Sequence, residues 1–437
     1  MEPWLTRAAR IHGARTAMRT PEGAQTTYAE LHERAGAVAS ELQARRVAPG
    51  DHVALALPSA DLVVALHACL LLGVVAIPID LRLTEAEQAL RTAHASVILE
   101  ELPSGPAGSA APRGPRDIDP GTTATLMFTS GTTAGPKPVA LSHDNWLWNA
   151  LGSALALGLD LDEAWLCPMP LAHVGGLSIQ IRSAVYGTTV LLHERFDTER
   201  ALSALMDSGQ RVTLVSLVPT MLSRLLDAGL REPPTLRRVL LGGGPIAPAL
   251  LDRARDAGVS VSPSYGMTEA CSQIATDGVP LLGTEVQIAS DGEVLVRGRT
   301  VSAGALGPDG WLHTGDLGTF DASDGDRGGR GGRLVIIGRK ADTIVSGGEN
   351  VAPAEVEAVL LEHPDVDDAA VLGRADPEWG EAVVAQVVIA DGAAVDAEAL
   401  HAHCAGRLAP FKVPKRFEPV SEVPRGSTGK LLRRELR

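Results

Sequence analysis

The sequence predicts an α/β fold, with a large N-terminal domain of parallel-rich sheets with helices and a small α+β C-terminal domain. Its 437 residues are more than one ordinary domain needs. Helix-like segments alternate with strand-like segments through most of the chain, which favours a largely parallel sheet covered by helices. The character of the sequence changes near residue 320. We therefore expect a boundary at residues 338 to 341, with domains at 1–338 and 339–437.

Capping boxes mark two helix starts within the first hundred residues. Thr27 with Glu30, and Thr84 with Glu87, each place a hydroxyl residue three positions before an acid. Apolar residues at helical spacing follow the first box. A stretch rich in Pro, Gly, Ala and Ser at 103–121 predicts a surface linker. The other elements expected here are strands at 51–58, 74–80 and 96–102 and a helix at 61–72.

Three polar or Gly-rich loops are predicted to follow buried strands. Open α/β sheets bind their ligands at the carboxyl ends of strands, so these loops are the candidate ligand-binding elements. The strands are expected at 125–128, 237–241 and 259–263, and the loops at 129–139, 242–246 and 264–269.

The C-terminal part is predicted to begin after a charged, Gly-rich turn at 321–333. The Gly-Gly-Arg repeat of this turn is compatible with RNA contact, but the tip of a hairpin is the favoured interpretation. Beyond the turn we expect helices at 353–361 and 396–408 and strands at 367–374 and 381–390.

The charge of the chain is unevenly distributed. A formal net charge of −14 argues against a nucleic-acid partner. Residues 407–437 nevertheless hold nine Lys or Arg against three Glu, a net charge of about +6. A solubilising tail is one interpretation of this segment. A role over a phosphate ligand is favoured, because the segment also carries patterned apolar residues.

The cysteines and apolar segments predict a cytoplasmic protein. Cys69, Cys167, Cys271 and Cys404 lie far apart, which favours neither a disulfide framework nor a zinc ribbon. The N-terminus lacks the apolar core of a signal peptide. The longest apolar run, 62–79, is interrupted by polar residues and predicts a buried helix and strand, so no stable membrane insertion is expected. A homodimer is left open by the sequence.

The stretch TSGTTAGPKPV at 129–139 is suited to holding phosphate. Its hydroxyls, backbone N–H groups and one lysine can surround phosphate oxygens. It lacks the Gly-Lys-Ser/Thr ending of the common phosphate loop, because Pro136 and Pro138 flank Lys137. An ordinary turn is the structural alternative. The candidate phosphate-binding residues are Thr129, Ser130, Gly131, Thr132, Thr133 and Lys137.

This loop and six further motifs, in order, resemble those of the adenylate-forming superfamily of acyl-CoA synthetases, peptide-synthetase adenylation domains and firefly-type luciferases. The loop departs from the usual pattern at Ala134 and Pro138, and both changes restrict the backbone. The further motifs are PLAHVGGL (170–177), LLGGGPI (240–246), SYGMTEA (264–270), GWLHTGDLG (310–318), GRKADTIVSGGENVAP (338–353) and PRGSTGKLLRREL (424–436).

The resemblance implies that a carboxylic acid attacks ATP to form an acyl adenylate and pyrophosphate, after which the thiol of coenzyme A takes the acyl group. Charge neutralisation should dominate the first step. The resemblance implies Lys430 as the main catalytic cation, Thr268 as a ligand of the α-phosphate and Glu269 as the Mg²⁺ ligand. The ribose contacts are expected to be Asp316 and Arg339, and the other nucleotide contacts Gly242, Gly243, Gly244, Ser264, Tyr265, Gly266 and Met267.

The resemblance also implies a mobile C-terminal domain that rotates between the two half-reactions and carries Lys430. The family pivot, two residues after Arg339, is commonly Asp or Lys, whereas this chain has Ala341, and Gly338 offers freedom nearby. The CoA-channel residues implied are Gly347, Gly348 and Glu349.

Several of these residues have a structural alternative. Lys430 would then be a surface lysine, Asp316 a turn residue, and Glu269 an acid that offsets a helix dipole in its first turn. His173 and Tyr265 would be core residues with satisfied partners.

Stretches such as 217–226 and 345–357 further resemble the o-succinylbenzoate–CoA ligases of menaquinone biosynthesis. That substrate carries a second carboxylate and a keto group, so a polar acyl site is expected, with His173, Arg182 and Ser272 as candidates. Arg182 is equally compatible with a surface position. The alternative functions are another aryl- or short-chain-acyl-CoA ligase, a stand-alone amino-acid adenylation enzyme and a non-catalytic nucleotide-binding regulator.

Overall fold

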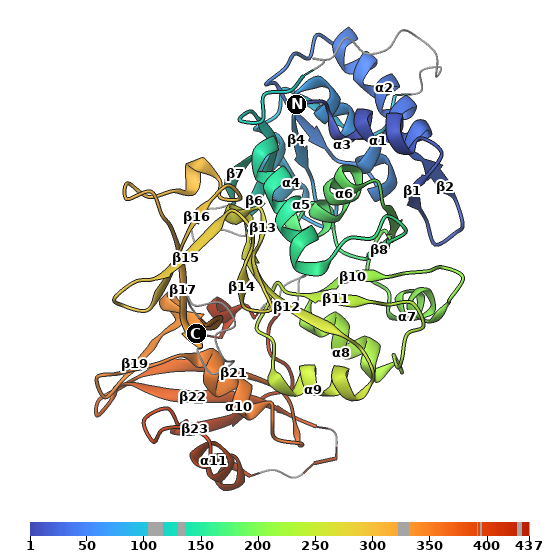
Figure 1. Cartoon of the computed structure of the whole chain (residues 1–437). Helices are drawn as coiled ribbons and strands as arrows, with labels where there is room; N and C mark the ends of the chain where they lie inside the picture. The colour runs from blue at the N-terminus through green and yellow to red at the C-terminus, as the bar shows by residue number, and fades with distance from the viewer. Residues whose placement is uncertain are drawn as a thin grey trace.

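The structure is a computed structural model that describes residues 1–103, 117–129, 136–321, 332–390, 392–393, 396–425 and 431–436. The described strands form four sheets. Figure 1 shows two large sheets with their helices in the N-terminal part, a four-stranded sheet beside them, and a small C-terminal unit beyond it. The predicted α/β class is therefore confirmed.

A five-stranded sheet is built from the first part of the chain. Its inner strands are parallel, and only the pair β6–β7 is antiparallel. Both predicted capping boxes are present, at Thr27 and Thr84, with the hydroxyl and the acid each bonded to the opposing backbone N–H. In order, the strands are β5 (Val97–Leu99), β3 (His52–Leu55), β4 (Val75–Pro78), β6 (Thr123–Thr129) and β7 (Lys137–Ser142), and their helices are α2 (Tyr28–Ala44), α3 (Ser59–Leu72) and α4 (Glu85–Thr92).

A nine-stranded sheet forms the middle of the molecule. Six neighbouring strands are parallel, two antiparallel strands (β13 and β14) close one end, and one antiparallel strand (β2) closes the other. In order, the strands are β14 (Val279–Pro280), β13 (Ser272–Thr276), β12 (Val261–Met267), β11 (Arg238–Leu241), β10 (Leu214–Leu217), β8 (Ala164–Cys167), β9 (Thr189–Leu192), β1 (Thr16–Arg19) and β2 (Gln25–Thr27). The helices of this part are α1 (Trp4–His12), α5 (His143–Leu157), α6 (Val174–Tyr186), α7 (Thr198–Met206), α8 (Pro219–Asp227) and α9 (Pro248–Asp256).

A four-stranded antiparallel sheet follows in the chain. It consists of β15 (Thr284–Ile288), β16 (Glu293–Gly298), β17 (Leu312–Asp321) and β18 (Arg333–Arg339). Asp321 pairs with Arg333, so the predicted turn connects two antiparallel strands, although its residues 322–331 lie outside the described part of the chain. The short helix η3 (Lys340–Asp342) leaves this sheet toward the C-terminal unit.

The C-terminal unit has its own hydrophobic core. All residues of that core lie between Ile344 and Phe417, beyond the predicted boundary at 338 to 341. The boundary itself stays a prediction. The elements are β19 (Ile344–Ser346), β20 (Glu349–Val351), α10 (Pro353–Leu360), β21 (Val366–Asp376), β22 (Gly380–Ile389), α11 (Ala397–Ala405), β23 (Arg416–Pro419) and the short helix η4 (Arg433–Glu435).

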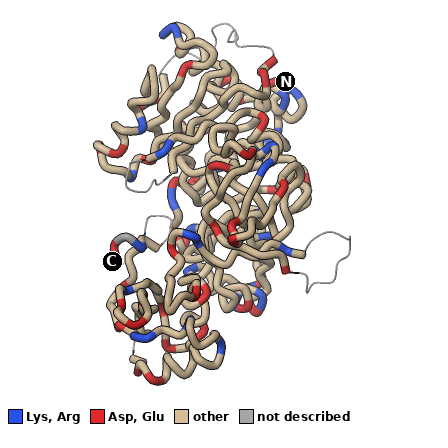
Figure 2. The backbone as a smooth tube through the Cα atoms, turned by 90° about the vertical axis from the view of Figure 1, so that its left-hand side faces the viewer, with Lys and Arg blue, Asp and Glu red and all other residues tan. Residues whose placement is uncertain are grey.

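One prediction about the protein's surface charge changes in the structure. Acidic and basic residues are interspersed along the backbone (Figure 2). Several cations of the basic segment at 407–437 form ion pairs with acids of the protein itself. Its Lys412 pairs with Glu355, and its Arg433 with Glu357. Hence the positive charge available to a phosphate is smaller than the residue count indicates.

The apolar run at 62–79 lies in the core as predicted, since every residue from Leu62 to Leu72 is buried in α3. No helix of the described residues is long and apolar enough to cross a membrane. All four cysteines are buried and free. Within the predicted linker 103–121, residues 104–116 lie outside the described part.

Candidate active site

Three side chains from two sheets meet at Asp316. The hydroxyl of Tyr265 on β12 donates to Oδ2 of Asp316 on β17 at 2.9 Å, and Nε of Arg339 on β18 lies 3.1 Å from Oδ1. Asp316 is buried, and burial together with this carboxylate raises the pKa of Tyr265. The carboxylate is therefore held in a fixed orientation while its remaining lone pairs can accept from a ligand. The predicted pair of Asp316 and Arg339 is thus brought together.

The predicted polar loop at 264–269 is partly wrong. Ser264 to Met267 continue strand β12 and pair antiparallel with β13, and only Thr268 to Ala270 leave it, as a single helical turn. The reversal is very tight: a Cβ on Gly266 would collide with the carbonyl oxygen of Ser272. Local sequence patterns do not reveal such a close backbone approach, which only glycine permits.

Thr268 and Glu269 stand on that turn. The backbone carbonyl of Glu269 accepts from the N–H of Ser302 at 2.8 Å, and the carbonyl of Thr268 accepts from the N–H of Cys271 at 3.0 Å. Among the described residues, no side chain pairs with the half-buried Glu269 carboxylate. No cluster of three or more His, Cys, Asp or Glu that could hold a metal occurs in the described part either. A cation here would need further oxygen ligands from a substrate.

The glycines after β11 have a packing role. The N–H of Gly242 donates to the carbonyl of Leu217 at 3.1 Å, and a Cβ on Gly242 would lie 2.9 Å from the carbonyl oxygen of Ser264. Gly243 has φ of +81°, which favours glycine. These glycines allow β11 and β12 to lie close together beside Tyr265. The nucleotide contact predicted for Gly242, Gly243 and Gly244 remains a prediction.

The predicted phosphate loop lies between the antiparallel strands β6 and β7. Thr129 at the end of β6 pairs with Lys137 at the start of β7, so the candidate loop joins two antiparallel strands. Pro138 is accommodated opposite Phe128 in that pair. Lys137 is exposed. Ser130, Gly131, Thr132, Thr133, Ala134 and Lys430 lie outside the described residues.

His173 sits next to an acid that the sequence analysis missed. It is the residue before α6, and its Nε2 lies 3.8 Å from Oδ2 of Asp80. Arg82 holds that carboxylate through its Nε and Nη2 at 2.8 and 2.6 Å. Burial lowers the pKa of His173, with Asp80 acting in the opposite direction. Asp80 follows β4, and its place at the carboxyl end of a parallel strand was the signal that could have identified it.

Arg182 is not at the surface. It lies in α6 with only 1% of its area exposed, and its Nε and Nη2 donate to Oδ1 of Asn149 at 3.2 and 2.5 Å. Its guanidinium lies 5.6 Å from the ring centroid of Trp165 and close to the buried thiol of Cys271, the neighbour of Ser272. Burial lowers the pKa of Arg182. No carboxylate pairs with it in the described part of the chain, which is costly for a buried cation.

The predicted CoA-channel residues form the turn between β19 and β20. Gly347 and Gly348 have φ of +61° and +85°, and Ser346 pairs with Glu349 across the turn. The N–H of Gly347 donates to the carbonyl of Trp379 at 2.8 Å, and a Cβ on Gly347 would lie 3.0 Å from the Trp379 ring. This glycine is therefore required by both conformation and space.

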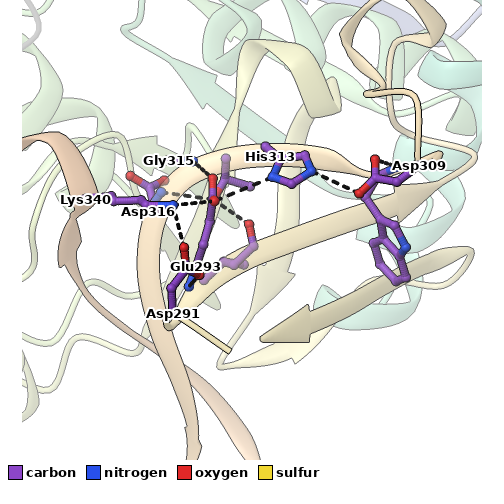
Figure 3. A network of polar contacts seen from close by, with 10 residues as sticks. Asp291, Glu293, Asp309, His313, Gly315, Asp316 and Lys340 are labelled. Atoms are coloured by element: carbon purple, nitrogen blue, oxygen red, sulfur yellow. Dashed lines mark hydrogen bonds and ion pairs between the residues drawn. The ribbon is translucent and has the colours of Figure 1, made fainter. Parts of the chain in front are cut away.

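A polar network beside Arg339 was also missed. Lys340 contacts Asp291 and Glu293, and Glu293 in turn contacts His313 and the N–H of Gly315 (Figure 3). Hydrogen bonds that His313 donates to the carboxylates of Asp309 and Glu293 raise the pKa of His313. Gly315 directly precedes Asp316. The network therefore stabilises the segment of β17 that carries the Asp316 carboxylate. Its partners are far apart in sequence, and no local pattern joins them.

The arrangement of a fixed buried carboxylate beside a cation and a tyrosine suits the recognition of a hydroxylated ligand. Two family profiles match the chain: AMP-binding enzyme over residues 5–306, and AMP-binding enzyme C-terminal domain over residues 355–430. Together they confirm the predicted superfamily.

The similarity to known proteins extends over nearly the whole chain. 2-Succinylbenzoate–CoA ligase from Bacillus licheniformis is 39% identical, over 99% of this chain and 98% of its own. The o-succinylbenzoate CoA synthetase of Bacillus subtilis in complex with the acyl-adenylate intermediate OSB-AMP superimposes with a TM-score of 0.89 at 36% identity, covering 100% of this chain and 98% of the other. The structure of the same enzyme in complex with ATP and magnesium ion gives a TM-score of 0.87 at 35% identity, covering 100% of this chain and 99% of the other.

A further structure of that Bacillus subtilis enzyme differs more. A double mutant bound with its product analogue OSB-NCoA gives a TM-score of 0.73 at 36% identity, again covering 100% and 98%. The relative therefore occurs in more than one arrangement, and this chain is closer to the acyl-adenylate complex. On the two family profiles and the full-length relatives, the chain belongs to the AMP-binding enzyme family.

Proposed function

We infer that the protein is an ATP-dependent 2-succinylbenzoate–CoA ligase, which converts the acid, ATP and CoA into the acyl-CoA, AMP and pyrophosphate. The observation that carries this inference is the buried Asp316, fixed by Tyr265 and Arg339, in a chain with full-length similarity to ligases of that name. Asp316 is expected to accept hydrogen bonds from the ribose hydroxyls of the nucleotide.

The first half-reaction joins two anions, so its barrier is largely electrostatic. An oxygen of the acid attacks the α-phosphorus of ATP, the bond to the β-phosphate oxygen breaks, and pyrophosphate leaves. Thr268 would donate to the α-phosphate, and Thr129 and Lys137, which pair at the ends of β6 and β7, would hold the departing phosphates. Mg²⁺, when bound, neutralises phosphate charge, and the carboxylate of Glu269, which has no side-chain partner among the described residues, would hold it.

The second half-reaction needs a different set of groups. The thiolate of CoA attacks the acyl carbon, and AMP leaves with the electron pair of the broken bond. We place Lys430 at the α-phosphate in the first half-reaction and Gly347, Gly348 and Glu349 beside the CoA thiol in the second, all on a mobile unit that begins at residue 339. Two observations support this: the C-terminal unit has a separate core, and the Bacillus subtilis relative occurs in two arrangements.

The acyl site is proposed to lie along α6. Arg182 is a buried cation without an acidic partner in the described part of the chain, next to Cys271 and Ser272. A substrate with a second carboxylate would supply the missing negative charge. His173, whose Nε2 lies 3.8 Å from Oδ2 of Asp80 at the start of α6, would face the reacting end of the acid. We place the reaction in the cytoplasm, in keeping with four free, buried cysteines.

A coupled assay tests the function directly. Purified protein is incubated with ATP, Mg²⁺, CoA and one acid from a panel of 2-succinylbenzoate, benzoate, fatty acids and amino acids, and both pyrophosphate and thioester are measured. Thioester formation with 2-succinylbenzoate at the highest kcat/KM supports the proposal. Pyrophosphate without thioester would indicate an adenylating enzyme of another kind, and absence of both with every acid would refute ligase activity.

A further inference from the structure

Three buried nitrogen atoms on three helices have no hydrogen-bond partner in the described part of the chain. They are Nε1 of Trp4 on α1, Nδ1 of His67 on α3 and Nε2 of His143, the first residue of α5. The three residues are 7%, 2% and 1% exposed. A buried polar atom without a partner destabilises the folded state, so each of these nitrogens needs a ligand or another explanation.

The same three residues line one small cavity. Its volume for the centre of a water molecule is about 10 Å³, which is close to the least that one water requires. The other described residues around the cavity have apolar side chains: Met1, Pro3, Leu5, Leu70, Leu71 and Ile118. The α-ammonium group of Met1 already donates to the carbonyl of Ile118 at 2.6 Å. The partners that the cavity offers to a ligand are therefore the indole and the two imidazoles.

The protonation of these rings follows from their surroundings. Burial lowers the pKa of His143, and burial together with the neighbouring His32 lowers the pKa of His67 to about 4, so both are neutral at neutral pH. Nδ1 of His143 lies 3.2 Å from the carbonyl oxygen of Thr122, and only a protonated nitrogen can donate to that oxygen. Nε2 of His143 is therefore an acceptor, whereas the indole nitrogen of Trp4 is a donor only.

A ligand between these atoms has to accept one hydrogen bond and donate others. A metal ion does not fit, because the indole N–H offers no lone pair and no carboxylate lines the cavity among the described residues. An ammonium ion has no lone pair with which to accept from Trp4. We propose that the cavity binds a single water molecule, which accepts from Nε1 of Trp4 and donates to Nε2 of His143 and Nδ1 of His67.

This water joins three helices that are far apart in the sequence. Figure 1 shows α1 beside α3 near the N-terminus, and the two helices are in contact. Through the water, α1 is fastened to α3 and α5 by hydrogen bonds in addition to its apolar packing. Buried waters usually make about three hydrogen bonds and are costly to remove. Local opening of α1 therefore requires the loss of this water, independently of any reaction that the protein catalyses.

A high-resolution crystal structure of the full chain tests the site. The expected result is electron density for one water within about 3.2 Å of Nε1 of Trp4, Nδ1 of His67 and Nε2 of His143. A cavity without density, or a water that reaches fewer than three of these nitrogens, would overturn the proposal.

Hydrogen exchange measured by mass spectrometry tests the link to α1. His67→Phe and Trp4→Phe each remove one partner of the water, and the amides of α1 should exchange about tenfold faster in each variant. The double variant should exchange little faster than the faster single variant, because both changes remove the same water. Effects that multiply in the double variant would contradict one shared water.

His193→Phe is the matched control for these variants. His193 is also buried, and its Nδ1 has no partner in the described residues, but it follows β9 and lines a different cavity. Exchange of the α1 amides in His193→Phe should equal that of the wild type. An acceleration as large as that in His67→Phe would mean that loss of any buried histidine loosens α1, and would contradict the proposed site.

Discussion

The hydroxyl of Tyr265 lies 2.9 Å from Oδ2 of Asp316, so a strand of the nine-stranded sheet orients a carboxylate on the four-stranded sheet. The two residues are 51 positions apart in the chain. Because a hydrogen bond to a charged group contributes about 1.5–3 kcal/mol, this contact is a substantial part of the site's preorganisation.

Tyr265→Phe should therefore weaken nucleotide binding. Without the hydroxyl, Arg339 is the one described side chain left on the Asp316 carboxylate, and we expect KM for ATP to rise about tenfold, which corresponds to about 1.4 kcal/mol. Steady-state kinetics at saturating acid and CoA measure this. Tyr28→Phe is the control, because that hydroxyl donates to the carbonyls of Ser183 and Thr188 in the core. An equal rise of KM in both variants would contradict a specific role of Tyr265.

The contact at Asp316 also illustrates how far sequence patterns reach. The motifs predicted that Asp316 and Arg339 belong together, and they pair across β17 and β18. The capping boxes at Thr27 and Thr84 were equally predictable, since all their atoms lie within four residues. Such local features are specified by neighbouring residues alone.

Other features depend on segments far apart in sequence. Ser264 to Met267 look like a polar loop but form strand, because β13 returns against them and Gly266 allows the close approach. The anchoring of Lys340 requires acids 47 and 49 positions away. Arg182 has the charge of a surface residue, and only the packing of α6 against α5 shows that it is buried. These features follow from tertiary packing, which a local pattern does not encode.

Arg182→Met should discriminate between two acids. If Arg182 recognises the second carboxylate of 2-succinylbenzoate, KM for that acid should rise at least about tenfold. KM for 4-oxo-4-phenylbutanoate, which lacks the ring carboxylate, should stay near the wild-type value. The variant also removes a buried cation that no acid neutralises in the described part of the chain, but it leaves Asn149 without two hydrogen bonds, so stability should change little. A similar loss with both acids would assign Arg182 a structural role.

The raised pKa of His313 predicts that this residue contributes to the free energy of unfolding in a pH-dependent way. Its pKa is raised above the ordinary 6.5 by Asp309 and Glu293. A raised pKa means that protonated His313 favours the folded state, so its contribution is fully present below pH 6.5 and is lost as pH rises through the folded-state pKa. Urea unfolding of wild type and His313→Asn across this range should show a stability difference that shrinks with increasing pH. A difference that is constant or grows would contradict the ion pairs.

Two glycines in one turn offer a matched comparison. Gly347→Ala adds both left-handed strain and a contact with the Trp379 ring, whereas Gly348→Ala adds strain alone, because no atom lies within 4 Å of its Cβ position. Strain of this kind costs about 1–2 kcal/mol. If the turn lines the CoA channel, Gly347→Ala should slow thioester formation more than Gly348→Ala. Pyrophosphate release from ATP and acid should change little in either variant. Equal loss in both half-reactions would place the turn outside the CoA path.

Lys430 provides the sharpest test of the two-step assignment. We expect Lys430→Ala to lower adenylation at least about a hundredfold, since a cation at the α-phosphate stabilises charge that develops in the transition state. Thioester formation from supplied acyl adenylate should be spared. In that step the thiolate attacks the acyl carbon, so no additional negative charge develops at the α-phosphorus. Rapid-quench measurement of each half-reaction gives the comparison. Lys412→Met, which breaks an ion pair with Glu355 in the same unit, controls for loss of a C-terminal cation. Equal losses of both half-reactions in Lys430→Ala would mean that the lysine serves one arrangement common to both steps.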